Sequence, residues 1–260
     1  MIGWNEFIWF GAGAMMFALI ASVMSFCSRK KAAVVLTTSA ILILLAYIVG
    51  LWITLDRPPL RTTGETRLWY SFFAMISGLA TYMRWGYKWI IPFSSILASV
   101  FIMLNIFKPE IHDQALMPAL QSPWFIPHVT VYMFSYSLLG CSFIISVYSL
   151  FKRNSRTEEE KMLKSADTLV YIGTAFLTFG MLSGSIWAKQ AWGHYWGWDL
   201  KEVWALITWL CYILYIHLRI LRKGQARILW ILLIFAFACL QMCWWGVNLL
   251  SAAANSMHTY

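Results

Sequence analysis

The segment from Trp187 to Trp209, WAKQAWGHYWGWDLKEVWALITW, brings together residue types that bind planar ligands. Within thirteen residues it contains Trp192, Trp196, Trp198 and Trp204, alongside Gly193, Gly197, Asp199, Lys201 and Glu202. Indole rings separated by glycines predict a flat, rigid, apolar platform that a large planar ligand can approach closely. The alternative is an interfacial belt, because tryptophan favours the headgroup region of a membrane. Glycine spacing and the adjacent carboxylates favour the platform, since a belt needs tryptophan only at helix ends.

Two histidines are candidates for binding a metal. His128 lies where the proline-rich segment 108–128 enters an apolar run, and His258 follows the last apolar run of the chain. Two neutral imidazoles from different elements can bind a metal, including heme iron from its two axial sides. The alternative is that each imidazole only satisfies a local hydrogen bond at a wet interface.

His217 differs because it lies inside an apolar run, about one helical turn from the end of that run at Arg219 and Arg222. An ionisable side chain within a membrane span is costly and usually faces the bundle interior, so a functional role is expected. Snorkelling toward the nearby membrane interface is the competing explanation. Of the remaining histidines, His112 is predicted to have no role, and His194, inside the tryptophan-rich segment, is a candidate for contact with the ligand but not for metal ligation.

The composition excludes an ordinary water-soluble globule. Hydrophobic residues make up 60% of the 260 residues and charged residues only 12%, against about 25% charged in soluble domains. The net charge of +9 does not indicate nucleic acid, because the lysines and arginines lie in short loops between apolar segments. None of the five cysteines forms a CxxC pair, so zinc or thioredoxin-like chemistry has no support.

Apolar runs of about 20 residues predict an all-α polytopic membrane protein with about eight transmembrane helices. The predicted spans are 7–27, 33–55, 68–85, 89–107, 129–151, 168–188, 204–221 and 228–250. We expect an N-terminal four-helix half, residues 1–107, and an irregular loop, 108–128, that leads to His128. The second membrane half, residues 129–260, contains the tryptophan-rich segment 189–204.

The basic residues predict how the chain is oriented in the lipid bilayer. One alternating set of loops carries 14 of the 20 lysines and arginines, and the other set carries six. The positive-inside rule therefore places both termini, and the loops 56–67, 108–128 and 189–203, on the outer side. We predict a multi-pass protein of the bacterial inner membrane with its site facing the periplasm, and a thylakoid membrane is the alternative.

Several separated motifs resemble one family in order along residues 120–260. WGHYWGWD, from Trp192 to Asp199, is similar to the WGxxWxWD signature, or WWD domain, of heme-handling proteins in cytochrome c maturation. The continuation KEVWALITW and the distal His217 narrow the resemblance to the CcsA (ResC) branch of the system II cytochrome c synthase. SPWFIPHV with the following Ser135–Tyr136 pair, and GVNLL with the later His258, agree with that branch.

The resemblance implies a ligand set. His128 and His258 match outer histidines that act as axial ligands to the iron of heme b. His217 matches a membrane-embedded histidine that holds heme in transit, with a second histidine supplied by a CcsB/ResB-like membrane partner. The heme-contacting positions carried over from the signature are Trp192, Trp196, Trp198 and Asp199.

The function that the resemblance implies is heme delivery across the membrane and covalent attachment of heme to the CxxCH segment of apocytochrome c. The chain would then be a heme lyase component, although no residue is identified as catalytic. The alternative is a heme transporter or chaperone that presents heme without attaching it, as in the related CcmC branch. A quinol-oxidising electron-transfer subunit is disfavoured, because only His217 lies inside a predicted span.

Overall fold

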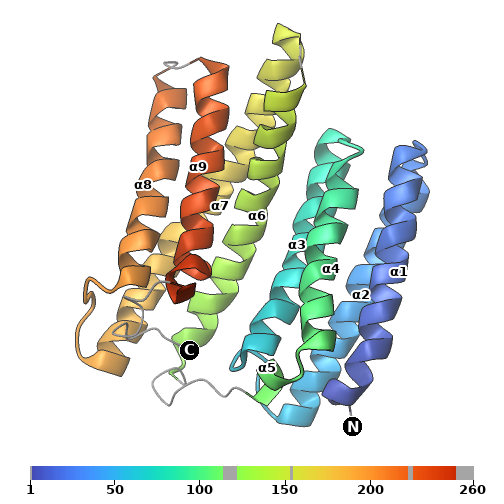
Figure 1. The fold of residues 1–260 in the computed structure, drawn as a ribbon, viewed down its shortest axis with the longest axis vertical. Coiled ribbons are helices and arrows are strands. Elements are labelled where there is room, and N and C mark those ends of the chain that lie inside the picture. The colour runs from blue at the N-terminus through green and yellow to red at the C-terminus, as the bar shows by residue number, and fades with distance from the viewer. Residues whose placement is uncertain (1, 114–121, 153–154, 222–224, 250–260) are drawn as a thin grey trace. The chain divides into compact units, whose positions relative to one another are not determined.

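The structure, a computed structural model, describes residues 2–113, 122–152, 155–221 and 225–249. Its elements are all helices, which confirms the predicted all-α fold class (Figure 1). The chain divides into two compact units, residues 1–121 and 122–260, called unit 1 and unit 2 below.

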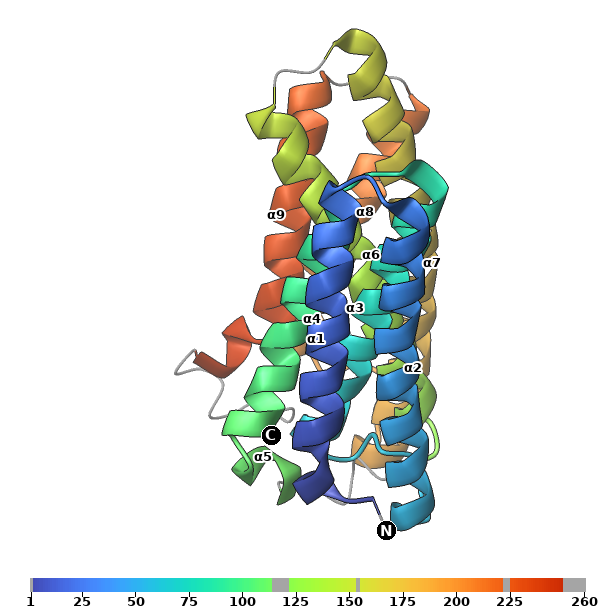
Figure 2. The ribbon, with the colours of Figure 1, turned by 90° about the vertical axis from the view of Figure 1, so that its right-hand side faces the viewer.

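The described residues of unit 1 form four long helices and a short one. After a single 3-10 turn, Trp4–Glu6, these are α1 (Phe7–Phe26), α2 (Lys30–Leu55), α3 (Thr63–Trp85), α4 (Ile90–Phe107) and α5 (Glu110–Asp113). Figure 2 shows α1 and α2 running side by side, and α3 packs mainly against α4. The start of α3 is fixed by a capping box, in which the Thr62 hydroxyl accepts the Glu65 backbone N–H at 3.1 Å.

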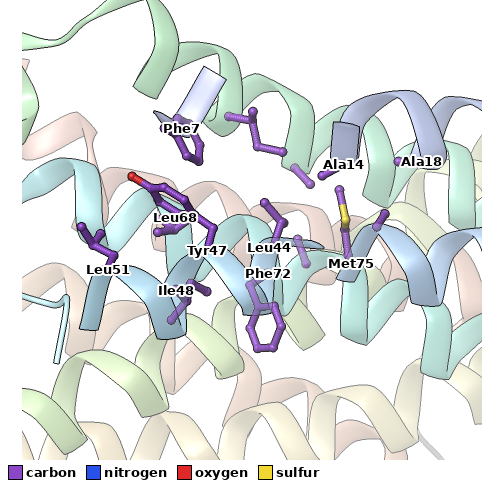
Figure 3. Close-up of a cluster of buried hydrophobic side chains, with 14 residues drawn as sticks. Phe7, Ala14, Ala18, Leu44, Tyr47, Ile48, Leu51, Leu68, Phe72 and Met75 are labelled. Carbon is purple, nitrogen blue, oxygen red and sulfur yellow. The ribbon is translucent and has the colours of Figure 1, made fainter. Parts of the chain in front are cut away.

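The core of unit 1 is an apolar cluster contributed by α1, α2, α3 and α4. Figure 3 shows Phe7, Tyr47 and Leu44 among its members, with Met75 of α3 beside them. The Tyr47 ring is fully buried, and its hydroxyl donates to the carbonyl of Gly3 at 3.1 Å. This bond satisfies the polar group that a buried tyrosine brings into the core, so the N-terminal turn is tied to α2.

Unit 2 contains the four helices that carry the predicted site. They are α6 (Phe125–Phe151), α7 (Arg156–Trp192), α8 (Leu200–Ile220) and α9 (Ala226–Trp244), followed by a 3-10 turn at Gly246–Leu249. Helix α6 packs along α7 and also against α9, while α8 packs on α9 and α7. The segment between α7 and α8, residues 193–199, lies at the end of unit 2 where α6 begins.

Helix α7 is longer than a membrane span. Its 37 residues extend about 55 Å at 1.5 Å per residue, against about 30 Å of hydrocarbon. In Figure 1 the α6–α7 end projects past the ends of α8 and α9. A capping box between Ser155 and Glu158 starts α7 twelve residues before the predicted span 168–188. Residues 156–167 therefore extend α7 beyond the predicted span.

A buried ion pair joins α7 to α8 near the projecting end. The Asp167 carboxylate of α7 accepts the Tyr215 hydroxyl at 2.7 Å and the Arg219 Nε–H at 2.8 Å. A further Arg219 nitrogen donates to the second carboxylate oxygen at 2.5 Å. Because every acceptor of the carboxylate is used by side chains of α8, this contact fixes how α8 is rotated about its axis.

Seven helices of the described residues are long and apolar enough to cross a membrane. They correspond to seven of the predicted spans, and the chain is a multi-pass membrane protein. The predicted third span forms helix α3, but α3 is not among the seven. Polar and aromatic residues within the predicted span 68–85 itself, including serines, tyrosines, tryptophans and Arg84, lower its mean hydropathy.

Candidate functional site

His128 lies in the first turn of α6, and α7 fixes its imidazole. The ring Nδ1 is 2.8 Å from the backbone carbonyl oxygen of Gly180. A carbonyl can only accept, so Nδ1 must carry the proton. In the neutral imidazole the lone pair is then on Nε2, which is the nitrogen that would bind a metal. The same carbonyl also accepts the hydroxyl of Ser183 at 3.1 Å, so Ser183 shares this acceptor.

Helix α7 can approach the imidazole closely because it presents glycines there. Gly180 and Gly184 are four residues apart and therefore lie on one helical face, toward α6. A Cβ added at Gly184 would lie 2.6 Å from both Cε1 and Nδ1 of His128, and one at Gly180 would overlap the Tyr132 ring. No side chain fits at either position, so the two glycines form a notch that accommodates the rings of α6.

Aromatic side chains surround the imidazole. The ring of Trp187, one turn beyond Gly184, stacks near His128 at 5.7 Å between centroids and 22° between planes. Trp192 meets Trp187 edge to face at 4.7 Å, and Tyr132 lies 4.5 Å from His128 on its own helix. Trp187 is only 2% exposed. The structure therefore brings His128 and Trp192 into one aromatic cluster through Trp187.

Gly184→Ala is expected to displace the His128 imidazole, because the new methyl group would occupy the space now filled by the ring. With His128 as the expected heme ligand, this displacement predicts about a tenfold or greater loss of heme bound to the purified protein. The matched control is Gly173→Ala on the same helix face, where a Cβ would meet Leu139 at 2.7 Å instead of an imidazole. Equal heme loss in both variants would show that overpacking, not the imidazole, is responsible.

The segment from Gly193 to Asp199 is held by hydrogen bonds at both ends. Gly193 ends α7 in the left-handed conformation, with φ of 85°, and its carbonyl accepts the Lys189 ammonium at 2.7 Å. The Asp199 carboxylate accepts the Lys201 backbone N–H at 3.2 Å at the start of α8. The Glu202 carboxylate accepts the N–H groups of Gly197 and Asp199 at 2.8 and 3.1 Å. Both acidic residues thus shape the segment.

The tryptophans of this segment do not form one flat surface. The rings of Trp196 and Trp198 are 5.9 Å apart and perpendicular, at 85°. The expectation of a single flat platform is therefore wrong for this pair, because edge-to-face contact suits the ring quadrupoles better than coplanar packing. Trp198 is 70% exposed and has a positive φ of 56°, a conformation that costs a bulky residue about 1–2 kcal/mol. The backbone thus holds the Trp198 indole outward.

His217 lies at the other end of α8, 17 residues after Leu200 and therefore about 25 Å along the helix. Its side chain is exposed, so it does not face the interior of unit 2 as expected. The cause is the rotation of α8: Tyr215 and Arg219 point to Asp167, and His217 is about 200° from each around the helix. It shares its outer stripe with Leu214 and Leu221, which are 47% and 45% exposed.

The structure thus groups the predicted residues in three places. His128 and Trp192 share the aromatic cluster, Trp196, Trp198 and Asp199 belong to the capped segment, and His217 is distant from both. His258 lies outside the described residues. Sequence reasoning missed Gly180 and Gly184, although glycine four residues apart on the face that carries Trp187 was a readable signal.

The chain is similar to proteins of cytochrome c maturation. The family described as "Cytochrome C assembly protein" matches residues 60–254, which include α3 to α9. The "Cytochrome c biogenesis protein CcsA" of Chlamydomonas reinhardtii is 35% identical over 174 residues, which covers 64% of this chain and 48% of that protein. Its counterpart from Buxus microphylla is 28% identical over an alignment of 317 residues, which covers 95% of this chain and 98% of that protein.

The chain matches about half the length of some relatives, as with the 48% of the Chlamydomonas protein and 58% of the Mesostigma viride CcsA. A solved structure, "Cytochrome c Heme Lyase CcmF", superposes with a TM-score of 0.66 at 18% identity. That superposition covers 94% of this chain and 46% of the other. At this identity the likeness concerns the fold alone.

Proposed function

This chain belongs to the cytochrome c assembly protein family, and from that premise we propose that it delivers heme across the membrane and attaches it to apocytochrome c. The heme b substrate binds at the His128 end of unit 2, with His258 as the second axial ligand. Covalent attachment to a CxxCH segment makes the chain a heme lyase component. The observation that carries this proposal is the imidazole of His128, whose Nδ1–H is held by the Gly180 carbonyl at 2.8 Å.

The fixed imidazole supports heme ligation on chemical grounds. Metal-binding histidines commonly donate one ring N–H to a carbonyl, which selects the tautomer and raises the basicity of the other nitrogen. The aromatic cluster of Trp187 and Trp192 packs beside the ring and gives it an apolar surrounding. The exposed indole of Trp198 offers an apolar surface to the macrocycle. Trp196 and Asp199 belong to the same segment, and Asp199 acts there by capping α8.

His217 supports a second, separate heme contact. An exposed imidazole on an apolar membrane stripe is costly unless another group covers it. In the proposal, a CcsB/ResB-like membrane partner packs on this stripe and supplies a second histidine. Heme then enters through His217 and moves to His128, and the distance between the two ends of α8 separates capture from attachment. The proposed membrane is the bacterial inner membrane, with the His128 end facing the periplasm.

In the attachment step the chain orients its substrates. The two cysteine thiols of the apocytochrome add across the two vinyl groups of heme, so that each vinyl gains one S–C bond and one hydrogen. Electrons balance without an external oxidant. Bis-histidine ligation leaves no open position on the iron, which protects the reduced state from oxygen until the CxxCH histidine displaces one ligand. The contribution of the protein is proximity and exclusion of side reactions.

Product analysis tests this function directly. The chain is co-expressed with its CcsB/ResB-like partner and a CxxCH apocytochrome in a host that lacks its own maturation genes, and covalent heme is measured on denaturing gels. We expect heme that stays with the cytochrome polypeptide after denaturation. Cytochrome without covalent heme, together with heme bound to the chain, would instead establish a transporter or chaperone.

A further inference from the structure

The segment between α7 and α8 has an inner and an outer side. His194 and Trp196 are partly buried, whereas Tyr195 and Gly197, which alternate with them, are exposed. Tyr195 is 59% exposed, with the Lys189 ammonium 5.5 Å from its ring centre. The alternation leaves the imidazole and the indole of this segment, called its inner side chains below, less exposed than the tyrosine.

Both inner side chains carry a polar atom without a partner. The Nδ1 of His194 and the Nε1 of Trp196 are inaccessible to solvent and have no hydrogen-bond partner among the described residues. An unsatisfied buried polar group costs the desolvation of that group, and a bound ligand or water that supplies the missing partner removes this cost. Two such atoms lie only two residues apart, in the segment that resembles a heme-binding signature.

The chemistry of these atoms restricts what they can bind. An indole N–H only donates, and the imidazole nitrogen donates when it carries the proton, so the common partner is an acceptor. The acidic groups of the segment are already engaged, because Asp199 and Glu202 accept backbone N–H groups. The charges of these two carboxylates are matched by Lys189 and Lys201, so the segment does not repel an anion. Heme offers suitable acceptors in its two propionate carboxylates.

We propose that the segment between α7 and α8 recognises a propionate carboxylate of heme through the indole N–H of Trp196 and the imidazole of His194. This inference rests on the proposed function and assigns part of it: His128 binds the iron, Trp198 offers an apolar surface, and the two inner side chains recognise the edge of the macrocycle that carries the acids. Recognition of that edge fixes which way the ring faces, and hence directs the vinyl edge toward the incoming thiols.

Heme and heme dimethyl ester, whose carboxylates are blocked, distinguish this role from general apolar binding. Each compound is titrated into the purified chain with its partner, for wild type, Trp196→Phe and Trp198→Phe. We expect wild type to favour heme over the ester, and Trp196→Phe to lose about tenfold of that preference, as for one charge-assisted hydrogen bond. Trp198→Phe is the matched control, since it weakens binding of both compounds alike and keeps the ratio.

Heme and its ester partition differently into detergent micelles. Because this difference is the same for every protein in one detergent, comparing each variant with wild type removes it. If wild type showed no greater preference for heme over its ester than the two variants show, recognition of the carboxylate would be overturned. Heme binding itself would remain. The same ratio in Trp196→Phe and wild type would remove Trp196 from that role. Failure of wild type to bind either compound would instead overturn the proposed function on which the inference rests.

Discussion

His128→Ala is expected to reduce covalent attachment of heme to apocytochrome c by more than about 100-fold, because removing a ligand exceeds the cost of disturbing its orientation. The variant loses the lone pair of Nε2, and it also leaves the Gly180 carbonyl with one donor fewer. The loss is measured as heme-stained cytochrome on denaturing gels, normalised to the amount of membrane-inserted chain.

The control for this prediction is His112→Gln, which changes a histidine in α5 of unit 1 that the proposal does not use. His112 stacks on Trp4 at 3.8 Å, so this change tests a packed histidine without touching unit 2. We expect its attachment activity to remain near that of wild type. Comparable losses in the two variants would indicate a general effect of replacing packed histidines and would contradict a ligand role for His128.

Asp167→Ala is expected to lower the free energy of unfolding by about 3 kcal/mol, because removing one partner of a buried pair leaves the other charge uncompensated. The side chains of Asp167 and Arg219 are only 12% and 17% exposed, and the Tyr215 hydroxyl loses its acceptor as well. Equilibrium unfolding in detergent measures the effect. The same variant frees the rotation of α8, so heme bound through His217 should decrease with it.

Glu160→Gln is the matched control for Asp167→Ala, since Glu160 also pairs with Arg219, at 3.6 Å, but is 52% exposed. An exposed pair contributes about 0–1 kcal/mol, so this change should have little effect on stability or heme content. Equal destabilisation by the two variants would contradict the conclusion that the Asp167–Arg219 pair holds α8 in place.

Most of the fold could be predicted from the sequence because the length of an apolar run, which identifies a membrane-spanning helix, is a local property of the chain. Each of the eight predicted runs corresponds to a long helix, but several helices begin before the predicted span, by five residues for α3 at Thr63 and by twelve for α7 at Arg156. Both begin with a capping box, Thr62 with Glu65 and Ser155 with Glu158, and both extend beyond the apolar run. Hydropathy alone cannot place such ends, whereas the capping pattern in the sequence could have.

The site was less predictable because its geometry depends on contacts between distant residues. The pairing of His128 with Gly180 spans 52 residues, and periodicity does not say which face of α7 meets α6. Similarly, the outward direction of His217 follows from the Asp167 pair, 48 to 52 residues away from its partners in α8. The capping contacts of Asp199 and Glu202 are local by contrast, because both carboxylates accept backbone N–H groups no more than five residues away.

The absorption spectrum of the reduced, purified chain with its CcsB/ResB-like partner tests the central claim most directly. Wild type is compared with the double variant His128→Ala and His258→Ala at equal protein concentration. The account predicts a reduced bis-histidine heme spectrum in wild type that is lost or shifted in the double variant. An unchanged spectrum in the double variant would move the iron to His217 or elsewhere and contradict the assignment of His128 as a heme ligand.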